Sequence, residues 1–407
     1  SGVSATGLEE IVISNLDTGA SDTLTLDAGA INGLTHIYAE NSTATGEVSV
    51  TNLKVLVDGV MTANLGDLTL GYAYGTLVTV GSADIQKLSA SGTNGRFIAN
   101  GFETIAITTT GSSVTLADVM STALEKITVS GDHNLTLTEA VAALTVDASA
   151  LKGRLTLSAT SVSGHTITSG LGDDNITGGA NADIISGGAG ADTITGGSGA
   201  DTLNGGADND NFIYLLTADL MTGQAKTDTS VAGGDGTADK LTLGTSGTAF
   251  AIANNDIWTG ITTIEKIVAV ANTAAVTIAL DLTAQTVTGI ETVDISAVTK
   301  STGNIVDASE FTSTSTSLML KGSATGATTL KGGAGSDTLI GGAVADNLSG
   351  GAGADVITGG AGADTIGGDS GADTITGDAG ADMITGGAGA DVIDGGEDND
   401  TFIYVAT

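Results

Sequence analysis

The 407-residue sequence contains no cysteine and no proline. Without cysteine there are no disulfides and no thiolate metal sites, so an extracellular protein of this kind needs another cross-link. Without proline, nothing interrupts a long ladder of paired strands. Aromatic residues make up only 3% of the chain. The apolar residues are mainly Ala, Val, Ile and Leu, which favour thin β layers over a bulky globular core.

Basic residues are also scarce, because 12 Lys and Arg stand against 47 Asp and Glu and give a formal net charge of −35. Nucleic acid and anionic membrane surfaces would repel such a chain, so we expect no nucleic-acid partner, whereas cations should be attracted. No apolar run approaches about 18 residues, so we expect no membrane insertion. The sequence opens SGVSATGLEE, without an initiator Met or an apolar signal segment. This opening predicts processing or a longer polypeptide.

Glycine is abundant, with 62 residues, and much of it lies in two arrays of nine-residue units, 169–213 and 332–403. Aspartate recurs at every ninth position of both arrays. In the first array these residues are Asp174, Asp183, Asp192, Asp201 and Asp210. In the second they are Asp337, Asp346, Asp355, Asp364, Asp373, Asp382, Asp391 and Asp400. Such internal periodicity is typical of solenoid architectures.

The chain reads as one module used twice, because the arrays share their flanking sequences. The first array ends in DNDNFIY (208–214) and the second in DNDTFIY (398–404), and similar lead-ins precede both. The connection contains GGDGTADKL (233–241), which resembles a damaged repeat. We therefore predict four segments: an irregular β-solenoid at 1–168, a first β-roll at 169–214, a second solenoid segment at 215–331 and a second β-roll at 332–407.

Outside the arrays, many short β-branched stretches alternate polar and apolar residues and are separated by Gly, Asn, Asp and Ser turns. They are EEIVIS (9–14), DTLTLD (22–27), LKVLVD (53–58), DLTLG (67–71), TLVTV (76–80), ETIAIT (103–108), EKITVS (125–130), NLTLT (134–138), ALTVD (143–147) and RLTLS (154–158). The predicted fold class is all-β, with parallel β-solenoid segments stacked on the rolls; a β-sandwich is the alternative. The best candidate for a short helix is 116–126.

Each unit follows the pattern G-G-x-G-x-D-x-U-x, where U is Ile, Leu or Phe. The last three residues predict a minimal strand with one inward side chain, and the first six predict a tight loop and no strand. Two units would complete one coil, so the aspartates of stacked loops approach at about 4.7–4.9 Å. Bare carboxylates this close repel, which predicts a cation between the loops. Carboxylate and carbonyl oxygens, without His or Cys, favour Ca²⁺.

The thirteen repeat aspartates are the candidate metal ligands. If each ion bridges loops two units apart, the arrays hold about nine Ca²⁺ at most. Asn181 and Val344 replace the fourth-position glycine, which predicts the loss of some sites, and Asp208 and Asp398 occupy the same position in the terminal units. Phe212 and Phe402 are expected to plug the open end of a thin core.

These units resemble the RTX calcium-binding nonapeptide repeat. The resemblance implies a parallel β-roll that is secreted unfolded by a type I system and folds on meeting external Ca²⁺. It also implies that the sixth-position aspartates are side-chain ligands and that the glycine-rich loops supply carbonyl oxygens. The flanks GFETIAITT (101–109) and GIETVDISA (289–297) and the lead-ins resemble bacterial RTX surface-layer (S-layer) proteins, which form a calcium-ordered lattice on the outer membrane.

The sequence contains no recognisable catalytic site, and we predict that the protein is not an enzyme. It has no H-E-x-x-H and no G-x-S-x-G with a histidine partner. His36, His133 and His165 are expected to lie at the surface or in ordinary packing. Lys and Arg are scattered singly, whereas an enzyme acting on acidic polysaccharide would need clustered bases.

We therefore predict a secreted, calcium-binding structural protein on the bacterial cell surface that self-assembles into an S-layer or a related sheet or filament. Its main partner would be further copies of itself, with cell-surface polysaccharide as a second candidate. Trp258, Tyr72 and Tyr74 could line a sugar-binding surface, although strand packing explains them more simply. The alternative function is the calcium-stiffened stalk of an RTX adhesin, and an RTX enzyme fragment is a distant third.

Overall fold

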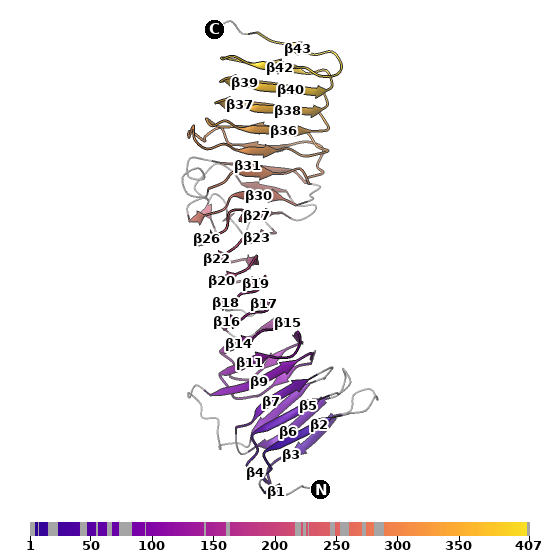
Figure 1. Ribbon diagram of the computed structural model, residues 1–407, viewed down its shortest axis with the longest axis vertical. Coiled ribbons are helices and arrows are strands. Elements are labelled where there is room, and N and C mark those ends of the chain that lie inside the picture. The colour runs from indigo at the N-terminus through magenta and orange to yellow at the C-terminus, as the bar shows by residue number, and fades with distance from the viewer. Residues whose placement is uncertain are drawn as a thin grey trace. The chain divides into compact units, whose positions relative to one another are not determined.

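The computed structural model describes residues 5–6, 8–14, 23–40, 47–53, 56–62, 67–72, 84–93, 95–141, 144–159, 163–215, 221–222, 225–226, 228–244, 249–252, 260–270, 274–280 and 289–404. The described residues form β-strands and turns and contain no helix, which confirms the predicted all-β class (Figure 1). They therefore include no helix that is long and apolar enough to cross a membrane. The chain divides into two compact units, Ser1–Gly205 and Gly206–Thr407. The division into four segments stays a prediction.

The first unit is built from stacked parallel strands in three main sheets. One sheet contains β2 (Glu10–Ser14), β5 (His36–Glu40), β7 (Asp58–Thr62), β9 (Ile85–Ser91), β11 (Thr104–Thr109), β14 (Lys126–Gly131), β16 (Thr145–Leu151), β18 (Thr166–Thr168) and β20 (Ile184–Ala189). A second contains β3 (Thr23–Asp27), β6 (Glu47–Leu53), β8 (Leu68–Tyr72), β10 (Phe97–Ile98) and β13 (Val119–Met120). A third contains β12 (Val114–Leu116), β15 (Leu135–Val141), β17 (Leu155–Ala159), β19 (Asn175–Gly179) and β21 (Thr193–Gly197). The short strands β1 (Ala5–Thr6) and β4 (Ile31–Asn32) also pair in parallel, and β22 (Thr202–Ala207) crosses the unit boundary.

The second unit has two long parallel ladders. One contains β23 (Asn211–Tyr214), β27 (Lys240–Leu243), β30 (Lys266–Ala269), β32 (Thr292–Asp294), β34 (Met319–Lys321), β36 (Thr338–Gly342), β38 (Val356–Ala361), β40 (Thr374–Ala379) and β42 (Val392–Asp394). The other contains β28 (Phe250–Ile252), β31 (Val276–Ala279), β33 (Asn304–Asp307), β35 (Thr328–Lys331), β37 (Asn347–Ala352), β39 (Thr365–Ser370), β41 (Met383–Thr385) and β43 (Thr401–Phe402). Strands β26 (Ser230–Gly234) and β29 (Ile261–Thr262) pair in parallel, and β24 (Met221–Thr222) and β25 (Ala225–Lys226) form an antiparallel pair.

The parallel pairing identifies both units as β-solenoid and rules out the sandwich alternative, whose sheets would be antiparallel. Within the arrays a strand pairs with the strand 18 residues further on, as Ile357 does with Ile375. Two nine-residue units therefore make one coil, as the sequence predicts. The end of the first array is an exception, because Phe212 there pairs with Leu241. Figure 1 shows β37 and β38 on one level and β39 and β40 on the next.

From β36 to β41 the core is a stack of single aliphatic side chains, one from each strand. Leu339, Ile357 and Ile375 pair in register along one ladder and are all buried. Each belongs to the U position of its unit, so the predicted inward side chain is confirmed. This thin core buries little apolar area per coil, and its stability depends on neighbouring coils.

The prediction that the first six residues of a unit are not strand is wrong for the first three. Strand β38 runs on through Gly359, Gly360 and Ala361 of the next unit, and Gly360 pairs with Asp378 of the following coil. Glycine makes this possible because Gly360 has a φ of 103°, which side-chain-bearing residues rarely adopt.

The predicted helix at 116–126 is also wrong. Leu116 ends β12, Val119 begins β13, and both side chains are buried with strand alternation. The main chain bonds across coils and not along a helix, since Phe97 N–H donates to the carbonyl of Asp118 at 3.0 Å. Ladder pairing thus overrides the local helical pattern.

The stretch LKVLVD (53–58) is only partly strand among its described residues. Leu53 ends β6 and Asp58 begins β7, while Leu56 and Val57 belong to no strand. The predicted strand TLVTV (76–80) lies outside the described residues.

Candidate metal centre

The repeat aspartates point into the protein. Eleven of the thirteen are buried: Asp174, Asp183, Asp192, Asp201, Asp210, Asp337, Asp346, Asp355, Asp364, Asp373 and Asp382. Asp391 and Asp400, at the last coil, are partly exposed. Carboxylates are almost never fully buried unless they are paired, so their burial requires a binding partner for the charge.

One oxygen of each carboxylate ties consecutive coils together. The N–H of Asp355 donates to Oδ1 of Asp373 at 2.9 Å, and the N–H of Asp346 donates to Oδ1 of Asp364 at 2.7 Å. The same contact recurs in the first array, where the N–H of Asp174 donates to Oδ1 of Asp192 at 2.7 Å. The aspartates paired in this way are 18 residues apart, so they form columns along each side of the coil.

The other oxygen is buried without a hydrogen bond from the described residues at many coils. This is true of Oδ2 of Asp183, Asp239, Asp346, Asp355, Asp364, Asp373 and Asp382. A buried carboxylate oxygen without a donor costs on the order of 1–3 kcal/mol or more. A bound cation would remove this cost.

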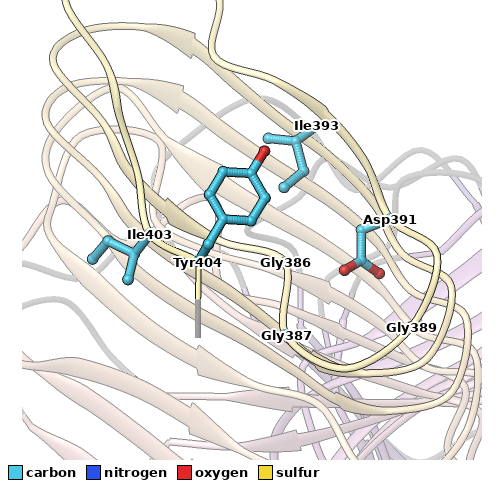
Figure 2. Close-up of a pocket in the computed structure, with 7 residues that line it drawn as sticks. All are labelled: Gly386, Gly387, Gly389, Asp391, Ile393, Ile403 and Tyr404. Atoms are coloured by element: carbon cyan, nitrogen blue, oxygen red, sulfur yellow. The ribbon is translucent and has the colours of Figure 1, made fainter. Parts of the chain in front are cut away.

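Backbone carbonyl oxygens reach the same place as these Oδ2 atoms. A Cβ added to Gly377, the first glycine of its unit, would collide with Oδ2 of Asp382 and with the carbonyl oxygen of Gly395, one coil further on. Figure 2 shows the loop of the last coil, where Asp391 lies beside the turn formed by Gly386, Gly387 and Gly389. Glycine is therefore required at the first position because carboxylate and carbonyl oxygens crowd around it.

Burial also changes the acidity of these groups. It raises the pKa of Asp346, Asp355 and Asp364 to about 6, and the neighbouring aspartates of the column add to the effect. Burial likewise raises the pKa of Asp174 and Asp337. Without a cation these carboxyls bind protons more tightly than a free aspartate does, so cations and protons compete for them at mildly acidic pH.

The donor set fits a hard cation that accepts backbone oxygens. Among the described residues, no three His, Cys, Asp or Glu side chains gather closely enough to hold a metal ion by themselves. Most ligands would therefore have to be carbonyl oxygens, with one or two carboxylates. Ca²⁺ takes six to eight oxygen ligands of this kind in flexible geometry, whereas Zn²⁺ prefers nitrogen and sulfur.

The column begins at a histidine. His165 lies 18 residues before Asp183, at the place of an aspartate, and is buried. Its N–H donates to Oδ1 of Asp183 at 2.7 Å, and its Nδ1 lies 3.0 Å from the same oxygen. This buried position agrees with the predicted packing role.

One carboxylate of the same kind is missing from the predicted ligands. Asp239, in the damaged repeat at 233–241, is fully buried, and its Oδ1 accepts the N–H of Asp210 at 2.6 Å. One extra residue between Gly236 and Asp239 breaks the nine-residue phase. The remaining Gly-Gly-x-Gly was the signal that could have identified it.

The predicted role of the two phenylalanines as end plugs is wrong for Phe212. It pairs with Leu241 of the next coil and is 0% exposed, so it belongs to the interior of the ladder. Phe402 does lie on the last strand of its sheet and is 44% exposed. Trp258 and Tyr74 lie outside the described residues, and Tyr72 ends β8.

A family model of the RTX calcium-binding nonapeptide repeat (four copies) matches residues 166–194, 177–212, 324–343, 340–375 and 367–402. These ranges contain all thirteen repeat aspartates. No curated protein matches the chain. RTX nonapeptide repeats bind calcium, and proteins that contain them are typically secreted and extracellular. The chain therefore contains RTX calcium-binding repeats, which form a parallel β-roll.

Proposed function

We propose that this protein is a non-enzymatic structural protein of the bacterial cell surface that self-assembles into an S-layer or a related extracellular sheet or filament. Calcium binding and an extracellular location follow from the RTX repeats. The principal partner in this proposal is another copy of the same chain.

The observation that supports self-assembly is that the two copies of the aromatic tail in the second unit differ in how deeply their side chains are buried. Phe212 and Tyr214 of DNDNFIY are 0% and 1% exposed, because β27 of the following coil covers them. Phe402 and Tyr404 of DNDTFIY are 44% and 89% exposed. Strand β43 is the last of its sheet among the described residues (Figure 1).

In this proposal a strand from a neighbouring copy pairs with β43, the last strand of its sheet among the described residues. Unpaired N–H and C=O groups of an edge strand are a template for pairing with another chain. Each aromatic side chain buries roughly 150–250 Å², worth about 4–6 kcal/mol at 25 cal/mol per Å² before the cost of association. The first copy of the motif indicates what kind of strand can cover it. After the first array, the strand Lys240–Leu243, which alternates polar and apolar residues, pairs with the end of DNDNFIY.

Calcium would control this assembly because folding creates the edge. The net charge of −35 opposes compaction, and the aspartate columns concentrate that charge. Extracellular calcium modules bind at about 10⁻⁴–10⁻³ M. A chain with sites of this class remains unfolded where calcium is scarce and folds outside the cell.

The test is a calcium titration followed by circular dichroism and electron microscopy of the same samples. We expect β structure near millimolar Ca²⁺ and then ordered sheets or filaments. The double variant Phe402→Ser/Tyr404→Ser should fold but assemble poorly, whereas Val356→Ser, an exposed aliphatic residue on the side of β38, should assemble normally. Folded single rods at high concentration would instead favour the adhesin stalk.

A further inference from the structure

The carboxylate column continues beyond the first array. The N–H of Asp210 donates to Oδ1 of Asp239 at 2.6 Å, and the N–H of Asp239 donates to Oε2 of Glu265 at 2.8 Å. This is the contact that joins aspartates within the arrays, but the spacing is 29 and then 26 residues instead of 18. Neither Asp239 nor Glu265 belongs to a residue range that the repeat model matches.

The surroundings of Asp239 are made of oxygen atoms. A Cβ added to Gly236 would lie 2.5 Å from the carbonyl oxygen of Asp208 and would collide with Asp239 Oδ1. A Cβ added to Gly233 would collide with the carbonyl oxygen of Thr263 and with Asp239 Oδ2. Two carbonyl groups and a carboxylate thus converge on this loop from three successive coils.

No Lys, Arg or His side chain of the described residues forms an ion pair with Asp239. Asp239 is 0% exposed, and its Oδ2 is buried without a hydrogen bond from the described residues. Burial raises its pKa, and burial together with Asp239 and Glu291 raises the pKa of Glu265. Two adjacent carboxylates in this setting are expensive unless a cation lies between the coils.

We propose that the loop 233–241 is a further calcium site, held by the Asp239 carboxylate, the carbonyl oxygens of Asp208 and Thr263, and the Glu265 carboxylate of the next coil. An all-oxygen donor set selects a hard cation, and a glycine-rich loop suits the flexible coordination of Ca²⁺ better than the strict octahedron of Mg²⁺. The site rests on the proposed calcium-dependent function. It extends the calcium column from the repeats into the coils of β27 and β30.

The test compares Asp239→Asn with Asp235→Asn in the full-length protein. Asp235 lies in the same loop with an exposed side chain, so it is the matched loss of one charge. Equilibrium dialysis with Ca²⁺ should show one ion fewer for Asp239→Asn and no change for Asp235→Asn. Asparagine keeps an acceptor for the N–H of Asp210, so the coil contact itself is preserved.

The stability of the fold provides a second readout whose sign of change depends on calcium. In saturating Ca²⁺, Asp239→Asn should melt several degrees below the wild type, because a bound ion is lost. In chelator it should retain at least as much β structure by circular dichroism as the wild type, since a buried charge has been removed. A purely structural carboxylate would give the same sign of change in both conditions.

An unchanged calcium count in Asp239→Asn would overturn the site. If that variant does not fold, Glu265→Gln provides the same comparison, because glutamine still accepts the N–H of Asp239. It should weaken the binding of one Ca²⁺ ion and leave the other sites unchanged; a Ca²⁺ titration identical to that of the wild type would reject the proposal. A wild-type protein that binds no calcium would instead contradict the proposed function as a whole.

Discussion

At the scale of the residue, the repeat aspartate uses its two oxygens for different purposes. In Asp364, Oδ1 accepts the N–H of Asp346 and fixes the spacing of the coils, while Oδ2 is buried without a donor among the described residues. The first oxygen explains why the repeat needs an acceptor at this position. The second explains why it needs a carboxylate, because asparagine would supply the acceptor but not the charge that attracts Ca²⁺.

The first glycine of each unit should be intolerant of even a methyl group. Gly377→Ala would place a Cβ against Oδ2 of Asp382 and the carbonyl oxygen of Gly395, so we expect a loss of about 1–3 kcal/mol, typical of overpacking. At Gly367 the nearest atom, Oδ1 of Asp369, would be 3.5 Å away, which is an ordinary contact. Gly367→Ala should therefore be neutral or slightly stabilising. Urea unfolding in Ca²⁺ measures both, and equal midpoints would contradict the crowding.

The calcium-free protein should become more stable on acidification. Burial raises the pKa of Asp346, Asp355 and Asp364 from 3.8 to about 6, so the folded state binds these protons more tightly than the unfolded state. Their destabilising effect is therefore present at neutral pH and is relieved as the pH falls from about 6 towards 4.

The measurement is circular dichroism in chelator at pH 7.5 and pH 5, with an expected rise in β structure at the lower pH. Asp364→Asn should reduce this rise because it removes one of the three groups. In Ca²⁺ the trend should reverse, since protons compete with the ion. Unchanged β structure in chelator at pH 5 would show that these carboxylates are not destabilising when ionised.

At the scale of the element, the nine-residue period predicted the coil well because one residue type marks each corner. Asp355 directly precedes β38, and Asp364 directly precedes β39, as the pattern indicates. The ends of the strands were less predictable, since whether Gly359 and Gly360 extend β38 depends on pairing with the next coil. The same dependence explains the wrong helix at 116–126. Asp239 was missed because its insertion changes the phase but preserves the contact.

The two aromatic tails have nearly the same sequence, yet their phenylalanines should differ in their contribution to stability. Phe212→Ala would leave a cavity beneath Leu241 and should cost about 3–5 kcal/mol. Phe402→Ala, on a partly exposed end strand, should cost well under half of that in dilute solution. Urea midpoints in saturating Ca²⁺ would measure the difference. Equal losses would mean that Phe402 is covered in solution as completely as Phe212.

At the scale of the whole molecule, each unit is a stack in which a coil contacts its immediate neighbours. Ile375, for example, pairs with Ile357 before it and Ile393 after it. In such a stack, stability is close to the sum of coil and interface contributions. The acidic composition acts against every interface, so the ions between the loops contribute to folding repeatedly along the chain.

Removing calcium should therefore unfold the arrays cooperatively, and neither salt nor Mg²⁺ should replace it. Sodium chloride at 1 M shortens the Debye length to about 3 Å and screens the repulsion between carboxylates, but it supplies no ion that is bound by carbonyl oxygens. Mg²⁺ requires a near-ideal octahedron that these glycine loops are poorly suited to form. Circular dichroism in chelator, 1 M NaCl, Mg²⁺ and Ca²⁺ should show full β structure only in Ca²⁺. If salt alone restored the spectrum, charge screening would be the main requirement for folding, and the coordination geometry of the loops would be secondary.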